Sequence, residues 1–196
     1  MGQAPINRRD CIVEATIRLI AEYGFHGTSV AMIAAAAGVG TGTIYRYFRD
    51  KDALVVEIFR QVDAVFKRTL LQDYDERRSV RERFFHLCRG VFRYGIAKPF
   101  EFKFIEQYLY SPYGTDLRRE KLFCARGENG DELPFSQVFE SGKRQRLIKD
   151  LPQFALIALA IGPVIFLVKD CISGLVRAED ATIDAVLSAC WDAVKR

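Results

Sequence analysis

The chain has 196 residues, of which 49% are hydrophobic and 28% charged, and its formal net charge is +4. This composition excludes a disordered chain and allows a substantial core in one large domain or two small ones, while the charge is too low to identify nucleic-acid binding by itself. Five cysteines without C-x-x-C spacing and only two histidines predict no metal site, no cofactor and a cytoplasmic protein with reduced thiols.

The apolar residues recur with a helical period from the N-terminus onward. A first helix is expected to end at Gly24, and Thr28 or Ser29 offers an N-cap for a second helix that stops at Gly38. A third, short helix is predicted at about 41–48. Two short helices joined by a glycine-containing turn are typical of a helix-turn-helix motif.

A long fourth helix is predicted at about 51–72, and the polar segment 73–79 indicates a boundary after it. We therefore expect a first domain over residues 1–52, with the helix-turn-helix at about 29–48, which the long helix joins to a second domain over 73–196.

The second domain is predicted to be helical as well, with helices at about 80–97, 99–110, 115–126, 135–146, 152–173 and 180–195 and a loop at 126–134. Strand-like alternation is nearly absent, so the fold class is all-α with about nine helices. The longest apolar run, Phe154–Val168, is shorter than the about 20 residues that span a membrane. We expect it to be a buried helix and expect no membrane partner.

A helical wheel of the third helix places Ile44 and Phe48 toward the core and Thr43, Arg46 and Tyr47 on the opposite arc. Arginine can bond guanine edges, and threonine and tyrosine hydroxyls can bond phosphates. The pattern therefore suits a DNA groove, although an ordinary amphipathic helix of any α-helical bundle would show it too.

A longer set of residues decides between these interpretations. It contains Thr28-Ser29-Val30, Ile33-Ala34, Ala37-Gly38-Val39, Gly42-Thr43-Ile44-Tyr45, Tyr47-Phe48, Lys51 and Leu54. Over about residues 8–60 the chain thereby resembles the N-terminal domain of the tetracycline-repressor (TetR) family of bacterial transcription regulators.

The resemblance implies a homodimeric repressor that binds double-stranded DNA at an inverted repeat and is released by a small-molecule effector. It implies phosphate contacts from Thr28, Ser29, Tyr47 and Lys51, and major-groove positions for Thr41, Gly42, Thr43, Tyr45 and Arg46. Gly40 and Ala31 depart from the family pattern, which often has serine and a charged residue there. Arg46 is therefore expected to carry more of the base recognition.

The resemblance also implies an interface formed by the last two long helices, for which we expect Leu156, Ile183, Leu187, Trp191 and Val194. One of these helices would leave a broad apolar face exposed in a monomer, although both could be core helices of one bundle. The aromatic-rich middle of the chain suggests a site for an apolar or aromatic effector, with Phe85, Cys88, Phe92, Phe104, Tyr108 and Phe166 as candidates. Each of these is also a plausible core residue.

The sequence leaves two other functions open. A thiol-based redox-sensing DNA-binding regulator would use Cys88, Cys124 or Cys171. An enzyme of unknown reaction would need a nucleophile and a base in convergent positions, and no serine or cysteine lies in a recognisable nucleophile elbow. We therefore expect no catalytic residues.

Overall fold

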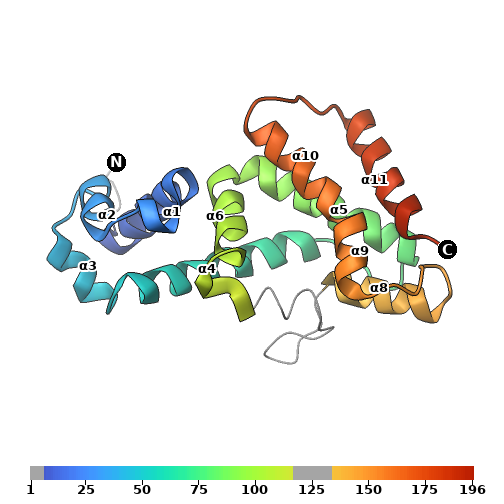
Figure 1. Cartoon of the computed structure of the whole chain (residues 1–196), viewed down its shortest axis with the longest axis horizontal. Coiled ribbons are helices and arrows are strands. Elements are labelled where there is room, and N and C mark those ends of the chain that lie inside the picture. Colours follow the sequence, from blue (N-terminus) through green and yellow to red (C-terminus); the bar gives the residue numbers. More distant parts are fainter. Residues whose placement is uncertain (1–6, 117–133) are drawn as a thin grey trace. The chain divides into compact units, whose positions relative to one another are not determined.

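A computed structural model describes residues 7–116 and 134–196 of the chain (Figure 1). These residues form helices throughout, and their one isolated β-bridge pairs Ile148 with Lys195. The predicted all-α fold class is therefore confirmed. The predicted helix at 115–126 and the loop at 126–134 lie almost wholly outside the described residues.

The described elements, in chain order, are α1 (Arg8–Gly27), α2 (Val30–Ala36), α3 (Thr41–Tyr47), α4 (Lys51–Leu71), α5 (Val80–Ala97), α6 (Pro99–Leu109), the 3₁₀ helix η1 (Pro112–Gly114), α8 (Pro134–Arg144), α9 (Gln153–Ala160), α10 (Gly162–Ile172) and α11 (Asp180–Val194). Most of these bounds agree closely with the predicted ranges. The exception is the helix predicted at 152–173, which is divided into α9 and α10.

Two glycines and a serine determine the backbone around the helix-turn-helix. Gly24 interrupts α1 at φ 73° and ψ 174°, a conformation that is essentially restricted to glycine. The Oγ of Ser29 accepts a hydrogen bond from the backbone N–H of Met32 at 3.2 Å and so caps α2. Gly38 adopts φ 65° in the turn between α2 and α3.

The chain divides into two compact units, which are described separately. The first contains the chain up to Val65 together with Phe100–Thr115, and the second contains Phe66–Pro99 and the chain from Asp116 onward. This division differs from the expected domains at 1–52 and 73–196, because a segment from the middle of the sequence packs with the N-terminal helices.

The first unit is built around Phe25, which lies just after the break in α1. Its ring lies 6.0 Å from Phe104, 6.5 Å from Tyr108 and 5.5 Å from Tyr113. Tyr108 also stacks on Phe59 of α4 with ring centroids 3.8 Å apart. The aromatic side chains of α6 and η1 are therefore part of the core behind the helix-turn-helix.

In the second unit α5 is central and packs against α8, α10 and α11, while α9 packs against α10 and α11. Phe84 of α5 lies 5.5 Å from Trp191 of α11, measured between ring centroids. Gly142 of α8 allows a close approach, because a Cβ there would lie 2.5 Å from the side chain of Ile148.

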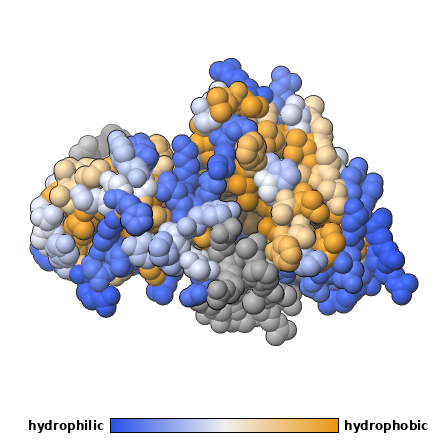
Figure 2. All heavy atoms as spheres, viewed as in Figure 1, coloured by the Kyte–Doolittle hydropathy of each residue, from blue (hydrophilic) through white to orange (hydrophobic). Residues whose placement is uncertain are grey.

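The segment Gln153–Ile172 corrects the expectation of a buried helix. Its buried positions recur at every fourth residue, at Leu156, Ala160, Val164 and Val168, with Ile161 as the one addition. The remaining surface is apolar but open, and Phe166 is 66% exposed. Figure 2 shows hydrophobic side chains gathered over this part of the second unit.

By length and composition alone, this 20-residue segment could cross a membrane, since its mean hydropathy reaches 2.2. Core helices of water-soluble proteins share that property. Only 28% of its most apolar window is buried, so much of its outer face is open to solvent in the part of the chain that the structure describes.

Gly38→Ala should destabilise the first unit by about 1–2 kcal/mol, because an L side chain is strained in the left-handed region. Gly42→Ala is the matched control, since a Cβ at either glycine meets no atom within 4 Å. Gly42 lies inside α3, where alanine is favoured over glycine by up to about 1 kcal/mol. Urea titration followed by circular dichroism measures both effects. Equal effects would show that the turn does not need the left-handed conformation.

Candidate functional site

The third helix, α3, presents a polar and aromatic surface to solvent. Ile44 and Phe48 are buried, as predicted. Tyr45, Arg46 and Tyr47 are exposed side by side on the remaining surface. Two phenols and a guanidinium are thus held on a short helix that is anchored by its apolar side.

Arg46 differs from its neighbour Arg49 in its partners. The Nε of Arg49 donates to the carboxylate of Asp50 at 2.7 Å. Arg46 makes no hydrogen bond or ion pair with any residue of 7–116 or 134–196. Its guanidinium is therefore available for an external acceptor, such as the O6 and N7 atoms of guanine.

The backbone near the start of α3 is open. Gly40 is the N-cap and contributes no side-chain hydrogen bond, in line with the weak cap expected there. A Cβ at Gly40 or Gly42 would meet nothing within 4 Å. Thr41 is exposed and Thr43 half-buried, so small and polar groups surround Arg46.

Two of the expected phosphate contacts are instead directed into the protein. Thr28 is 1% exposed, and its hydroxyl donates to the carbonyl of Gly24 at 2.8 Å. The ammonium of Lys51 donates to the carbonyls of Phe25 and Thr28. The break in α1 and its C-terminus leave carbonyls that need donors, so both side chains stabilise this end of the helix. Ser29, the neighbouring candidate, is exposed.

The start of α4 is tied to the segment after α6. The Oδ1 of Asp50 accepts from the N–H of Ala53 at 2.7 Å, and this bond, with the ion pair to Arg49, lowers the pKa of Asp50. The hydroxyl of Tyr113 donates to Oδ1 of Asp52 at 2.7 Å, which together with burial raises the pKa of Tyr113 to about 12. The tyrosine hydroxyl therefore stays protonated and holds η1 against α4.

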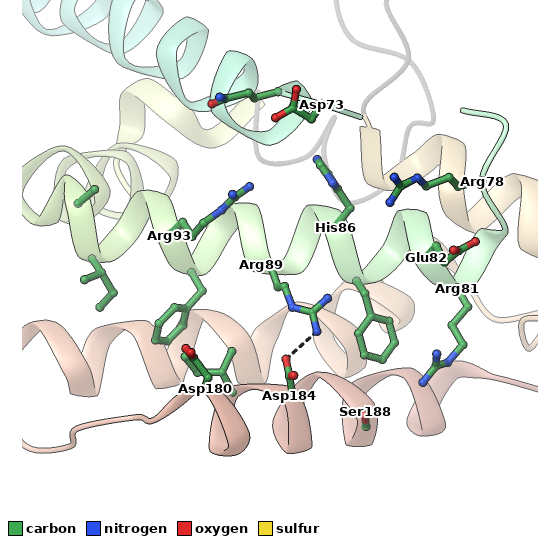
Figure 3. A pocket seen from close by; sticks show the side chains of 16 residues that line it. Asp73, Arg78, Arg81, Glu82, His86, Arg89, Arg93, Asp180, Asp184 and Ser188 are labelled. Carbon is green, nitrogen blue, oxygen red and sulfur yellow. Dashed lines mark hydrogen bonds and ion pairs between the residues drawn. The ribbon is translucent and has the colours of Figure 1, made fainter. Parts of the chain in front are cut away.

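The second unit contains a groove of about 1260 Å³ between α5 and α11 (Figure 3). Phe85 and Phe92 of α5 contribute rings, and the guanidinium of Arg89 bonds Asp184 of α11 at 2.7 Å. Further lining side chains with polar heads are Arg78, Arg81, Glu82, His86, Arg93 and Asp180. The guanidinium of Arg81 lies 4.4 Å from the centre of the Phe85 ring. The groove combines an apolar floor with charged rims.

The structure does not bring the six expected effector-binding residues together. Phe85 and Phe92 line the groove, and Cys88 is fully buried on the same helix. Phe104 and Tyr108 are core residues of the first unit, and Phe166 is exposed on α10. The sequence showed the rings but not their partners, because aromatic residues at helical spacing serve a core and a ligand site equally well. The polar residues Glu82, His86, Arg89 and Arg93 share one face of α5 by their spacing. The sequence suggests His86 and Arg89 as polar anchors of a ligand site, but not Glu82 and Arg93.

The expected interface residues are also corrected. Leu156, Leu187, Trp191 and Val194 are buried in the core of their own chain, and Ile183 lines the groove. The apolar side of α11 faces α5 and α9, so it is not available to a second copy. Of the exposed large apolar side chains of this unit, five lie along α9, α10 and the segment after α10, at Phe154, Leu159, Phe166, Leu175 and Val176, and three lie elsewhere, at Leu71, Ile96 and Leu147.

The cysteines differ in their surroundings. Burial, with a smaller contribution from neighbouring Cys190, raises the pKa of the Cys88 thiol well above its usual value, which disfavours the reactive thiolate. Cys171 is half-buried, and Cys124 lies outside the described residues. Among the residues that the structure describes, no three or more His, Cys, Asp and Glu side chains are grouped so that they could hold a metal ion.

Lys51→Met should lower the free energy of unfolding by about 1–3 kcal/mol, because it leaves two half-buried carbonyls without their charged donor. Arg49→Met is the control, since it removes an exposed cation two residues away and should leave the unfolding midpoint nearly unchanged. Thermal unfolding at fixed protein concentration compares them. A Lys51→Met protein as stable as the wild type would show that the ammonium is not needed there.

Two family models match the chain. The model described as bacterial regulatory proteins, tetR family, matches residues 12–58, and the model described as tetracyclin repressor-like, C-terminal domain, matches residues 79–195. An uncharacterised HTH-type transcriptional regulator of Haemophilus influenzae is 26% identical over 196 residues, which is 100% of both chains.

Crystal structures agree with these matches. A TetR-family regulator of Marinobacter aquaeolei VT8 is 28% identical with a TM-score of 0.79, covering 96% of this chain and 95% of that one. A putative TetR-family regulator of Vibrio parahaemolyticus is 26% identical with a TM-score of 0.74, covering 97% and 99%. The chain therefore belongs to the tetR family of bacterial regulatory proteins and is a DNA-binding transcriptional regulator.

Proposed function

We propose that the protein is a homodimeric repressor that leaves its operator when a small molecule binds the second unit. The observation that carries this proposal is the uncovered apolar face of α9 and α10, described above. A regulator of this kind acts in the cytoplasm, where its operator DNA lies.

The dimer is supported by exposed side chains rather than by the buried ones first expected. Leu159 and Phe166 leave apolar surface open along α9 and α10, and Leu175 in the connection to α11 is 78% exposed. Soluble proteins seldom leave such a surface uncovered, and a two-fold contact buries the same patch on both copies. Two copies also supply two recognition helices, which an inverted repeat with half-sites about 34–36 Å apart requires.

The contacts with DNA follow from the exposure of α3. Arg46 is assigned to a guanine edge in the major groove, because its guanidinium is free and bidentate. Tyr47 and Ser29 are assigned to phosphates, and Gly42 allows the backbone to approach the groove closely. Thr41, Thr43 and Tyr45 complete the surface that faces the bases.

The effector is assigned to the groove between α5 and α11, where Phe85 and Phe92 suit an apolar or aromatic body. Helix α4 is continuous, and its residues before and after Val65 belong to different units. A change in the second unit can therefore reach the first through this helix. A metabolite library, screened for release of an operator selected from random DNA, identifies the effector.

Arg46→Ala should weaken binding to that selected operator by about 1–3 kcal/mol and relax preference at one base position in each half-site. Arg49→Ala is the control, because its guanidinium is already paired with Asp50 and should not change base preference. Repeating the selection with both variants tests this. Unchanged sequence preference in Arg46→Ala would remove Arg46 from base recognition.

Phe166→Glu should give folded monomers that no longer bind the operator, because a carboxylate cannot be buried at the two-fold contact without a partner. Tyr23→Glu is the control, since Tyr23 of α1 is similarly exposed at 59% but lies in the first unit. Sedimentation at micromolar concentration gives the oligomeric state. A monomeric wild-type protein that protects a palindromic site with one chain would overturn the dimer.

A further inference from the structure

A positive charge is buried in the second unit, and no carboxylate of residues 7–116 or 134–196 pairs with it. Arg83 of α5 is 8% exposed, and its Nη2 donates to the Oγ of Ser141 on α8 at 2.9 Å. Its Nε is buried and has no hydrogen-bond partner. Burying a guanidinium is costly unless an anion and hydrogen bonds compensate for it.

A second unsatisfied donor lies beside it. The hydroxyl of Tyr74, in the connection between α4 and α5, is buried and has no hydrogen-bond partner. Burial raises the pKa of Tyr74, and the charge of Arg83 together with a polar contact from its side chain opposes that shift, although this contact falls outside hydrogen-bond geometry. The ring of Tyr74 also meets His86 edge-on, with centroids 5.6 Å apart.

The neighbouring carboxylates of the described residues are engaged elsewhere or turned to solvent. Glu82 bonds the hydroxyl and N–H of Ser79 in a capping box, and Glu140 pairs with Lys143. Glu76 is close enough to influence Tyr74 electrostatically, but it is exposed and bonds neither Tyr74 nor Arg83. Arg83 and Tyr74 therefore supply donors for which the described residues offer no anionic acceptor.

We infer that Arg83, Tyr74 and Ser141 bind an oxyanion, either a carboxylate or a phosphate. Such a group accepts from a guanidinium and two hydroxyls at once and supplies the missing negative charge. A second step rests on the proposed function: the oxyanion is the acidic head group of the effector. Arg83, Tyr74 and Ser141 do not themselves line the groove that holds Phe85 and Phe92, but His86 both lines it and contacts Tyr74, so His86 connects the two places.

Thermal unfolding of the full chain tests this site without DNA. The probes are inorganic phosphate, acetate and a carboxylate with an apolar tail such as octanoate, each titrated at constant ionic strength. For the wild type, the midpoint should rise with the logarithm of the anion concentration. Tyr74→Phe removes one donor and keeps the shape, and it should raise the apparent Kd roughly ten- to hundredfold. Arg83→Met should abolish the response.

Glu76→Gln is the matched control. It removes the one exposed carboxylate that acts on Tyr74, so it should leave anion binding intact or tighten it. If it instead destabilises the protein as much as Arg83→Met and no anion restores the loss, the chain supplies its own counter-ion and the inference is wrong. Should Arg83→Met fail to fold, Tyr74→Phe alone carries the comparison.

The three probes also distinguish between a free anion and the head group of a larger effector. Equal stabilisation by phosphate and acetate indicates a free anion, whereas stabilisation only by octanoate indicates the head group of a larger effector. An unchanged midpoint with all three probes overturns the site. Release of the operator is measured in a separate experiment. An anion that binds but does not release DNA supports the oxyanion site and contradicts only its link to the proposed function.

Discussion

The position of the recognition helix depends on the aromatic contacts of Phe25. Gly24 breaks α1 in a conformation that other residues avoid, and Phe25 then meets the rings of Phe104, Tyr108 and Tyr113. The carbonyl of Phe25 is held by Lys51, so the same residue joins the start of α4 to the end of α1. The helix-turn-helix is therefore supported from behind by α6 and η1, which lie far from it in the sequence.

The second unit has two features that a single unliganded chain does not satisfy: an exposed apolar face and buried donors without an acceptor. Leucine and valine side chains of α9, α10 and α11 fill the core against α5, and an apolar face remains open on the outside. Inside, Arg83 and Tyr74 are buried without an acceptor. Both features are costly for an isolated, unliganded chain. In the proposed dimer a second copy covers the face, and at the proposed oxyanion site an anion satisfies the donors.

Residues 41–48 show what the local hydrophobic pattern of a sequence can predict. The placement of Ile44 and Phe48 inside and Arg46 outside followed from the helical period, because a short helix anchored on one side has little freedom. The same argument failed for Trp191 and Leu187. An apolar stripe must be covered, but the period does not tell whether the cover is the same chain or another copy. The hydrogen bonds of Lys51 and Thr28 within the protein were not predicted for a related reason, since the carbonyls that accept them belong to a helix end that no local pattern brings close.

The sequence by itself determined the all-α class, most helix bounds, the glycine turns and the family. These rest on interactions between residues a few positions apart, and on a motif within one continuous stretch. Only the tertiary structure decided that α6 belongs with the DNA-binding unit, that α9 and α10 bury one face only, and that Arg83 meets Tyr74 and Ser141. These depend on which helices pack together, and the free energy of packing is set by residues that are distant in the chain.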